Sequence, residues 1–345
     1  MKKEPQQKTV TGIVGTAKNT GKTTTLNCLL KEAERRSISV GITGIGYDGE
    51  EADTVTLLPK PRIVVHPDSI VATSERCLEI STAPVEILHR TGLFTSLGEI
   101  LITRVLRAGL LVIAGPGKKE ELCIILDKMK QYEAGRIFVD GSLNRIAPMS
   151  AVDSVIFTTG GSRSTDIALL SSEMHAIESL FTVPLAPAGI LSAPECVEVP
   201  LLLEPRDVDD LLPVIRGDHT TLFITKYISQ AALVRLSDCC TNGLVNIQKI
   251  IFPDPFVLLM NENIVHTYKS ILKLQNHSIS VSYRCLPKLA YITANPFFPA
   301  YEGNTYSPQY LNGTELLMQL RKSCSTPVFD TQETEPSLLF NACFQ

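Results

Sequence analysis

The residues best suited to chemistry lie in one short loop near the start of the sequence. Gly21, Lys22 and Thr23 end a segment resembling the pattern G-x-x-x-x-G-K-[ST], with Thr16 at the place of the first glycine and Gly15 one position earlier. Loops of this pattern surround phosphate groups with backbone N–H donors, and the lysine adds a full positive charge. This loop is therefore the first candidate for a phosphate site.

The elements needed to position the loop are predicted on both sides of it. Residues 10–15 are an apolar, β-branched run that predicts a strand, and residues 21–36 have the periodicity of an amphipathic helix. We expect Lys22 to contact the β- and γ-phosphates, Thr23 to bind Mg²⁺ and Thr24 to reach the α-phosphate. The predicted nucleotide ligands are Thr16, Lys18, Asn19, Thr20, Gly21, Lys22, Thr23 and Thr24. The alternative is a glycine turn that only caps a helix.

Two acidic residues follow predicted strands and are candidates for the metal and the attacking water. Residues 136–140 are an apolar run ending in Asp140, which we predict to hold Mg²⁺. A second strand is predicted over residues 39–46, and Asp48 after it is the candidate for orienting water. Lys22 and Asp48 are thus the predicted catalytic residues. Each aspartate has a plain alternative as a turn residue.

Two further glycine-rich segments follow predicted strands. Residues 115–118 could line the nucleotide or substrate crevice, because ligands bind at the carboxyl ends of parallel strands. Residues 158–165 could bind the base or a second anion. Both segments are also compatible with simple strand-to-helix turns. No Asn-Lys-x-Asp guanine motif is found, which favours ATP over GTP.

The fold class predicted from the hydrophobic pattern is α/β. Continuous apolar runs alternate with amphipathic stretches, which indicates a mainly parallel sheet flanked by helices. The length of 345 residues favours two units, and six prolines concentrate between residues 184 and 213. We therefore predict a nucleotide-binding domain over 1–183, a junction over 184–213 and a small α/β docking or dimerisation domain over 214–345. The last dozen residues are interpreted as a tail.

Composition narrows the class of partner. The net charge of −4 gives no electrostatic basis for binding nucleic acid or an anionic membrane, so a protein partner is expected. No apolar run is long enough for a membrane span or a signal peptide. Nine scattered cysteines without a C-x-x-C pair indicate a reducing cytoplasm and no metal cluster.

Three stretches carry a resemblance to a known family: IVGTAKNTGKTTTLNCLL, ITGIGYDGE and FVDGSLNR. They resemble the P-loop accessory protein encoded beside lysine 5,6-aminomutase in lysine-fermenting bacteria, within the broader group of SIMIBI-type P-loop NTPases. The resemblance implies an ATP- and Mg²⁺-dependent subunit of a reactivase that releases damaged cobalamin from the aminomutase. Its implied partners are the aminomutase and a second reactivase subunit, and a homodimer is an open alternative. The chain has no D-x-H-x-x-G motif for holding cobalamin itself.

Two other functions remain open at this stage. The loop K-N-T-G-K-T-T is similar to that of the MobB proteins, and the dethiobiotin synthetases share the implied fold. That resemblance implies a biosynthetic ligase or kinase acting on a small acid or cofactor precursor. Only Lys118 and Lys119 lie where such an acid would bind, which makes this the weaker expectation. The third alternative is a nucleotide-gated binding module without turnover.

Overall fold

The computed structural model describes residues 8–46, 63–215, 220–302, 305–330 and 332–344. The chain forms two compact units. The first comprises Met1–Ser171 and Lys288–Gln345, and the second comprises Ser172–Pro287. The second unit is thus an insertion between two parts of the first, and each unit has its own sheet.

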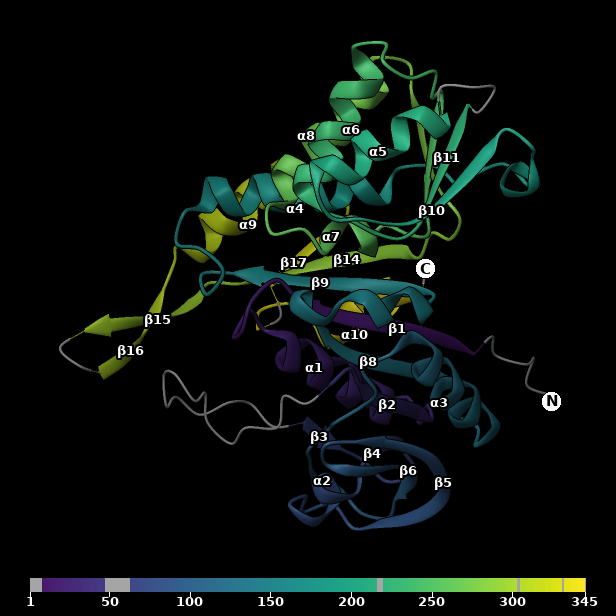
Figure 1. Ribbon diagram of the computed structural model, residues 1–345. Helices are drawn as coiled ribbons and strands as arrows, with labels where there is room; N and C mark the ends of the chain where they lie inside the picture. Colours follow the sequence, from purple (N-terminus) through teal and green to yellow (C-terminus); the bar gives the residue numbers. More distant parts are fainter. Residues whose placement is uncertain (1–7, 47–62, 216–219, 303–304, 331, 345) are drawn as a thin grey trace, which may run out of the picture. The chain divides into compact units, whose positions relative to one another are not determined.

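The first unit is built on a nine-stranded sheet in the order β17-β14-β9-β1-β8-β2-β4-β6-β5 (Figure 1). The neighbours from β17 to β4 are parallel, and β6 and β5 add antiparallel strands at one edge. Its strands are β1 (Thr9–Gly15), β2 (Val40–Gly44), β4 (Ile70–Ser74), β5 (Val85–Thr95), β6 (Gly98–Val105), β8 (Arg136–Ser142), β9 (Ser154–Gly160), β14 (Lys288–Asn295) and β17 (Val328–Asp330). A separate antiparallel pair joins β3 (Ile63–Val65) and β7 (Gly109–Leu111).

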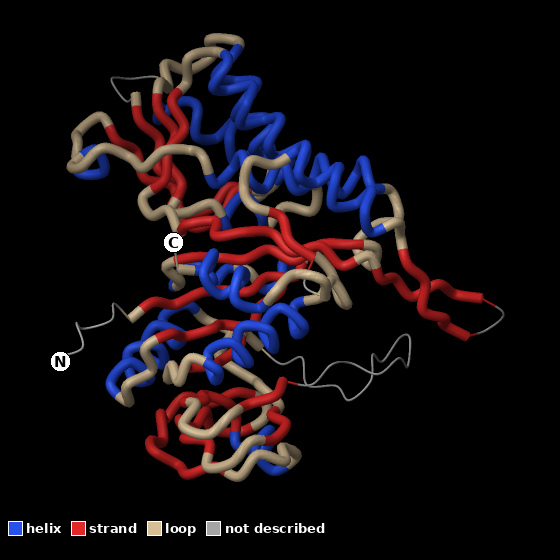
Figure 2. Tube along the Cα trace, turned by 180° about the vertical axis from the view of Figure 1, so that it is seen from behind, coloured by secondary structure: helices blue, strands red, loops and turns tan. Residues whose placement is uncertain are grey.

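Helices cover both faces of this sheet, as Figure 2 shows from behind. On one face, α1 (Lys22–Arg35) and α10 (Pro336–Cys343) share an apolar core with Ile13 and Phe138. On the other face, Met129 of α3 (Lys119–Gln131) lies against the position of Gly41. The predicted α/β class with a mainly parallel, helix-flanked sheet is therefore confirmed. The unit also contains α2 (Glu75–Glu79), α9 (Gly313–Ser323) and the short 3-10 turns Leu143–Arg145 and Ala147–Ala151.

A buried carboxylate links the first helix of the unit to the last. Glu32 is buried in α1 and pairs with Arg35 and Arg36 at 2.6 Å each. Arg36 in turn donates to Asn341 of α10 at 2.7 Å and lies over the Phe340 ring. The hydrogen bond from Arg35 is the main cause that lowers the pKa of Glu32 from 4.5 to about 2. The segment interpreted as a tail is thus a docked helix, because Leu339 and Phe340 supply buried apolar surface.

We expect Glu32→Gln to destabilise the protein in a pH-dependent way. A carboxyl whose pKa is lowered by folding stabilises the native state above its ordinary pKa of 4.5, and this contribution is lost as the pH falls towards 2. After allowance for the exposure of Arg35, the loss at pH 7 should be on the order of 2 kcal/mol. Urea unfolding at pH 7 and pH 3 measures it. The difference in free energy of unfolding between wild type and variant should be smaller at pH 3 than at pH 7. A difference that does not depend on pH would contradict this account, and so would an equal loss of stability in the exposed control Glu79→Gln.

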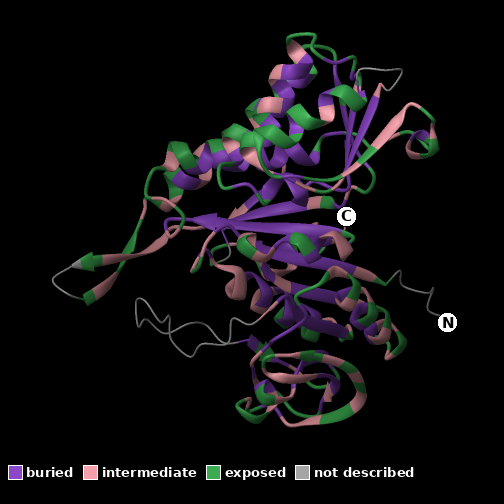
Figure 3. Ribbon diagram, in the orientation of Figure 1, coloured by how far each residue is buried: buried purple, intermediate pink, exposed green. Residues whose placement is uncertain are grey.

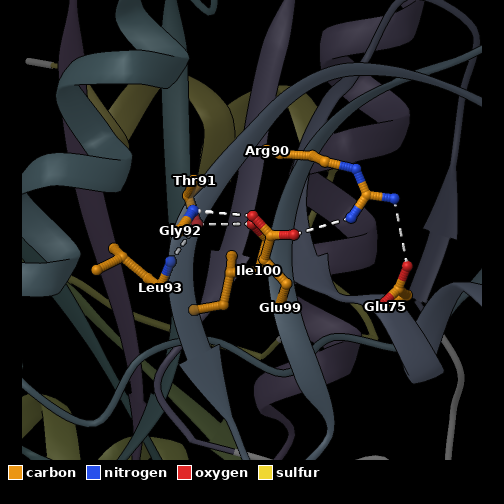
Figure 4. Close-up of polar contacts among 7 residues, drawn as sticks. All are labelled: Glu75, Arg90, Thr91, Gly92, Leu93, Glu99 and Ile100. Carbon is orange, nitrogen blue, oxygen red and sulfur yellow. Dashed lines mark hydrogen bonds and ion pairs between the residues drawn. The ribbon is translucent and has the colours of Figure 1, made fainter.

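The antiparallel edge of the sheet is shaped by a polar cluster on β5 and β6 (Figure 4). Glu99 of β6 accepts hydrogen bonds from Gly92 N at 2.9 Å and from Arg90 at 2.8 Å, and Arg90 also pairs with Glu75 at 3.4 Å. The β5–β6 register shifts between residues 90 and 94, where these contacts lie. A bulged, charged edge strand resists pairing with other chains. This edge is therefore interpreted as structural.

The second unit has a four-stranded parallel sheet in the order β10-β11-β12-β13. Its strands are β10 (Cys196–Leu202), β11 (Thr221–Ile228), β12 (Lys249–Phe252) and β13 (Ser280–Tyr283), and its helices include α5 (Pro205–Ile215), α6 (Gln230–Thr241), α7 (Phe256–Leu259) and α8 (Ile264–Asn276). The helices α5, α6 and α8 lie in one layer, because α6 packs against both of the others. The helix α4 (Ile167–Phe181) leads from the first unit into the second.

The predicted domain boundaries of 1–183, 184–213 and 214–345 differ from this division. The proline-rich segment is part of the second unit and forms β10 and α5, with Pro213 inside the helix. Residues from 288 onward return to the first sheet, where β14 pairs with β9. The predicted boundaries differ because strands distant in sequence continue the first sheet. Local sequence patterns do not reveal such long-range pairing.

Three findings concern the described residues of both units. Within the described ranges, no helix combines the length and apolarity needed to cross a bilayer. All nine cysteines are free thiols. Among the residues that the structure places, no cluster of three or more His, Cys, Asp or Glu side chains has the geometry of a metal site.

Candidate functional site

The loop over residues 15–23 leaves the carboxyl end of β1 between two parallel neighbours. Gly15 is in register with Ser142 of β8 on one side and with Thr158 of β9 on the other. The loop then enters α1 at Lys22, so its backbone N–H groups and the helix N-terminus meet at the end of β1, an interior strand of the sheet. A strand, loop and helix so arranged form an anion-binding concavity.

The lysine of the loop lies beside the predicted metal ligand. Lys22 Nζ is 3.1 Å from Asp140 Oδ1, and each side chain is only 14% exposed. Asp140 faces the loop because it pairs with Ile13 of β1 in the adjacent strand β8. The two residues are 118 positions apart in the sequence, and sequence reasoning assigned both to one site. The structure brings them together.

The threonines of the loop anchor it to β9. Thr16 N donates to Thr158 O at 2.9 Å, and the Thr16 hydroxyl donates to the same carbonyl and to Thr159. The Thr20 hydroxyl contacts Thr158 Oγ1 at 2.9 Å and donates to Ala17 O. Both residues were predicted as nucleotide ligands. In the structure they hold the loop against β9, so both hydroxyls and the Thr16 N–H are engaged in contacts within the protein.

A residue that sequence reasoning missed holds the loop from β14, the strand beyond β9 in the sheet. Asn295, the last residue of β14, donates from Nδ2 to Asn19 O at 2.9 Å. Asn19 and Gly21 have φ values of 61° and 96°, a left-handed conformation that an external contact can stabilise. A Cβ at Gly21 would lie 3.3 Å from Asn295 Cβ. Any other residue at this position would therefore have both an unfavourable positive φ and a close contact with Asn295. The apolar run ending in Thr293, Ala294 and Asn295 was the available signal.

We expect Asn295→Ala to weaken nucleotide binding about tenfold, the value of one well-placed hydrogen bond lost from a preorganised loop. Asn295→Asp keeps the acceptor that Phe297 N uses but cannot donate to Asn19 O, so it should weaken binding at least as much. Titration with a fluorescent nucleotide measures both. If both variants keep wild-type affinity, Asn295 does not position the loop.

The predicted glycine segments lie on both sides of the loop. Gly115 N donates to Gly46 O at 3.0 Å, and a Cβ at Gly115 would lie 1.8 Å from Gly44 O, so only glycine allows this approach. The guanidinium of Arg145, three residues after β8, lies against Gly46. This adds a cation at the carboxyl ends of β2 and β8. Residues 158–160, in contrast, serve as the anchor for Thr16 and Thr20 described above.

The oxygen ligands at the loop fit a magnesium ion. Asp140 Oδ1 is shielded from solvent and has no hydrogen bond from any residue that the structure describes, although it forms the ion pair with Lys22. Thr23 is in the first turn of α1 and is half-buried. Mg²⁺ prefers few protein oxygens together with waters and phosphates, so Thr23 and Asp140 would hold it. The ion would neutralise charge on phosphate oxygens.

Three predicted site residues need a separate statement. Lys18 is exposed at the tip of the loop, and Thr24 is half-buried in the first turn of α1. Asp48, the predicted water-orienting residue, lies outside the described residues. Its assignment therefore stays a prediction.

Comparison with known proteins gave no match to a protein family, a curated protein or a solved structure.

Proposed function

We propose that this chain is a P-loop nucleoside triphosphatase that binds ATP with Mg²⁺ through the 15–23 loop. The observation that carries the proposal is the contact of Lys22 with Asp140 at the carboxyl ends of β1 and β8. A lysine at a helix N-terminus supplies the phosphate cation, and an acid on the neighbouring strand supplies the metal ligand. A turn that only capped a helix would not need a shielded acid beside its lysine.

We further propose that the hydrolysis serves a protein partner in the cytoplasm, namely a cobalamin-dependent lysine 5,6-aminomutase that the chain reactivates with a second subunit. Support comes from the resemblance carried by the loop, by ITGIGYDGE and by FVDGSLNR. The acidic net charge, which disfavours nucleic acid and anionic membranes, agrees with a protein partner. Cobalamin would belong to the aminomutase.

The test measures phosphate release from ATP and Mg²⁺ by the purified chain, with and without inactivated aminomutase and the second subunit. Turnover that rises with aminomutase, together with recovered aminomutase activity, supports the proposal. Product formation from a small acid would instead favour a ligase or kinase of the dethiobiotin synthetase or MobB type. Tight nucleotide binding without turnover under every condition would favour a binding module.

A further inference from the structure

A two-stranded hairpin follows directly on the strand that ends at Asn295. It consists of β15 (Phe297–Glu302) and β16 (Thr305–Tyr310), which pair in an antiparallel register. Figures 1 and 2 show it extending from the end of β14. Residues directly opposite one another in such a pair project to the same side, and successive residues alternate between sides. The register therefore decides which side chains share a face.

One face of the hairpin carries only aromatic residues and proline. Its three cross-strand pairs are Phe297 with Tyr310, Pro299 with Pro308, and Tyr301 with Tyr306. The outer pairs are in ring contact, with centroids 5.8 Å and 5.1 Å apart. Tyr301 and Tyr310 are nevertheless each 63% exposed, and Figure 3 colours the described part of the hairpin as intermediate or exposed. We name these six residues the aromatic–proline face.

The base of the hairpin is fixed to the nucleotide side of the first unit. Phe297 N donates to Asn295 Oδ1 at 3.2 Å, and Ser162 donates to Phe297 O at 3.1 Å. Phe298, on the other face, lies against Gly161. An isolated hairpin is marginal in water, so these anchors and the ring pairs are what hold it. A face held in advance loses less entropy when a partner binds.

The chemistry of the face identifies the kind of occupant. Glu302 is the only charged residue between 297 and 310, so the hairpin lacks the cations that a phosphate backbone or an anionic membrane requires. Tyrosine is enriched in protein interfaces and in their binding hot spots. Pro299 and Pro308 carry no N–H, which disfavours edge-to-edge strand pairing with another chain. The occupant is thus an apolar protein surface that meets the rings face-on.

The size of the face argues against a second copy of this chain. Six residues of strand are about 20 Å long and two strands about 10 Å wide, so the face covers about 200 Å². A stable interface takes about 800 Å² from each partner. Two hairpins packed face to face would fall far short, whereas a groove that encloses the hairpin contacts both faces and both edges.

We propose that the aromatic–proline face is a docking surface, and that its occupant is a partner protein with an uncharged apolar groove that receives the hairpin. The inference rests on the proposed function for the identity of that partner, the aminomutase. Tyr301 and Tyr310 are its most exposed anchors.

The experiment uses the full chain with Tyr301→Ser and Tyr310→Ser combined, and measures its affinity for purified aminomutase in the presence of ATP and Mg²⁺. We expect binding at least about tenfold weaker than wild type, as for the loss of hot-spot residues. Basal nucleotide affinity should be unchanged, because both tyrosines belong to the hairpin strands and not to the 15–23 loop. The matched control, Thr305→Ala with Gln309→Ala, removes two polar side chains from the opposite face and should weaken binding far less than the tyrosine variant does.

Each outcome decides. Wild-type affinity in the tyrosine variant overturns the docking surface and leaves the proposed function intact. Failure of the wild-type chain to bind aminomutase overturns the proposed partner and, with it, the occupant named here. The oligomeric state of the chain is measured by sedimentation. A dimer that forms in wild type but not in the tyrosine variant would assign the face to a second copy and overturn the proposal. Loss of binding in the tyrosine variant alone, with a monomeric wild type, supports it.

Discussion

Replacement of Lys22 by alanine is expected to abolish nucleotide binding. Lys22 provides the cation at the helix N-terminus, 3.1 Å from the carboxylate of Asp140 on the adjacent strand. A charge-assisted contact with phosphate is stronger than a neutral hydrogen bond, and its loss should weaken ATP binding by at least about a hundredfold. Isothermal titration with ATP and Mg²⁺ measures the effect. Retained affinity would remove the basis for the proposed P-loop function.

The experiment must distinguish a loss of nucleotide binding from a loss of folding. Lys22→Ala leaves the shielded carboxylate of Asp140 without its cation, which can destabilise the fold. Lys22→Ala combined with Asp140→Asn removes the uncompensated charge, and we expect this double variant to fold and still fail to bind nucleotide. Lys31→Ala, an exposed lysine on the same helix, serves as the matched control and should bind normally. A double variant that recovers ATP affinity would show that Lys22 acts only on the fold.

The sequence was sufficient to predict the central part of the fold because its signals are local. The strand before Gly15, the helix after Lys22 and the run ending in Asp140 all appear where they were expected. The signal for each of these elements, whether a glycine pattern, an apolar run or an amphipathic period, lies within a single short stretch of the chain. The adjacency of Asp140 and Lys22 followed because parallel strands end at one sheet edge.

Features that depend on distant segments escaped prediction. The contact of Asn295 with Asn19 joins residues 276 positions apart, and the local apolar run before Asn295 predicts a strand but not its partner. Likewise, α10 was interpreted as a tail because its docking depends on Arg36 and on a face of α1 that is far away in sequence. The hairpin strands β15 and β16 were missed because two prolines reduce their strand propensity. Long-range packing overrode local preference at each of these places.

Replacement of Asp140 by asparagine is expected to change nucleotide binding in opposite directions with and without magnesium. In the structure Lys22 and Asp140 neutralise each other, so a phosphate must compete with the carboxylate for the lysine. Asparagine removes that competition, and affinity for ATP in EDTA should rise roughly fivefold, in line with about 1 kcal/mol for a partly shielded pair. Affinity with Mg²⁺ should no longer exceed the affinity without it, because the metal loses its acidic ligand.

Hydrolysis by the same variant should fall by at least about a hundredfold, since the phosphate charge is no longer balanced by a fixed metal ion. A structural role for Asp140 would weaken binding under both conditions and lower the thermal midpoint, so the sign of the change in EDTA distinguishes the two. Asp153→Asn is the matched control. It lies before the amino end of β9, where Asp153 accepts from Val10 N at 2.8 Å, and asparagine retains an acceptor oxygen there. If Asp153→Asn changed the Mg²⁺ dependence of nucleotide affinity as Asp140→Asn does, the effect would be due to net charge. That result would overturn the role given to Asp140.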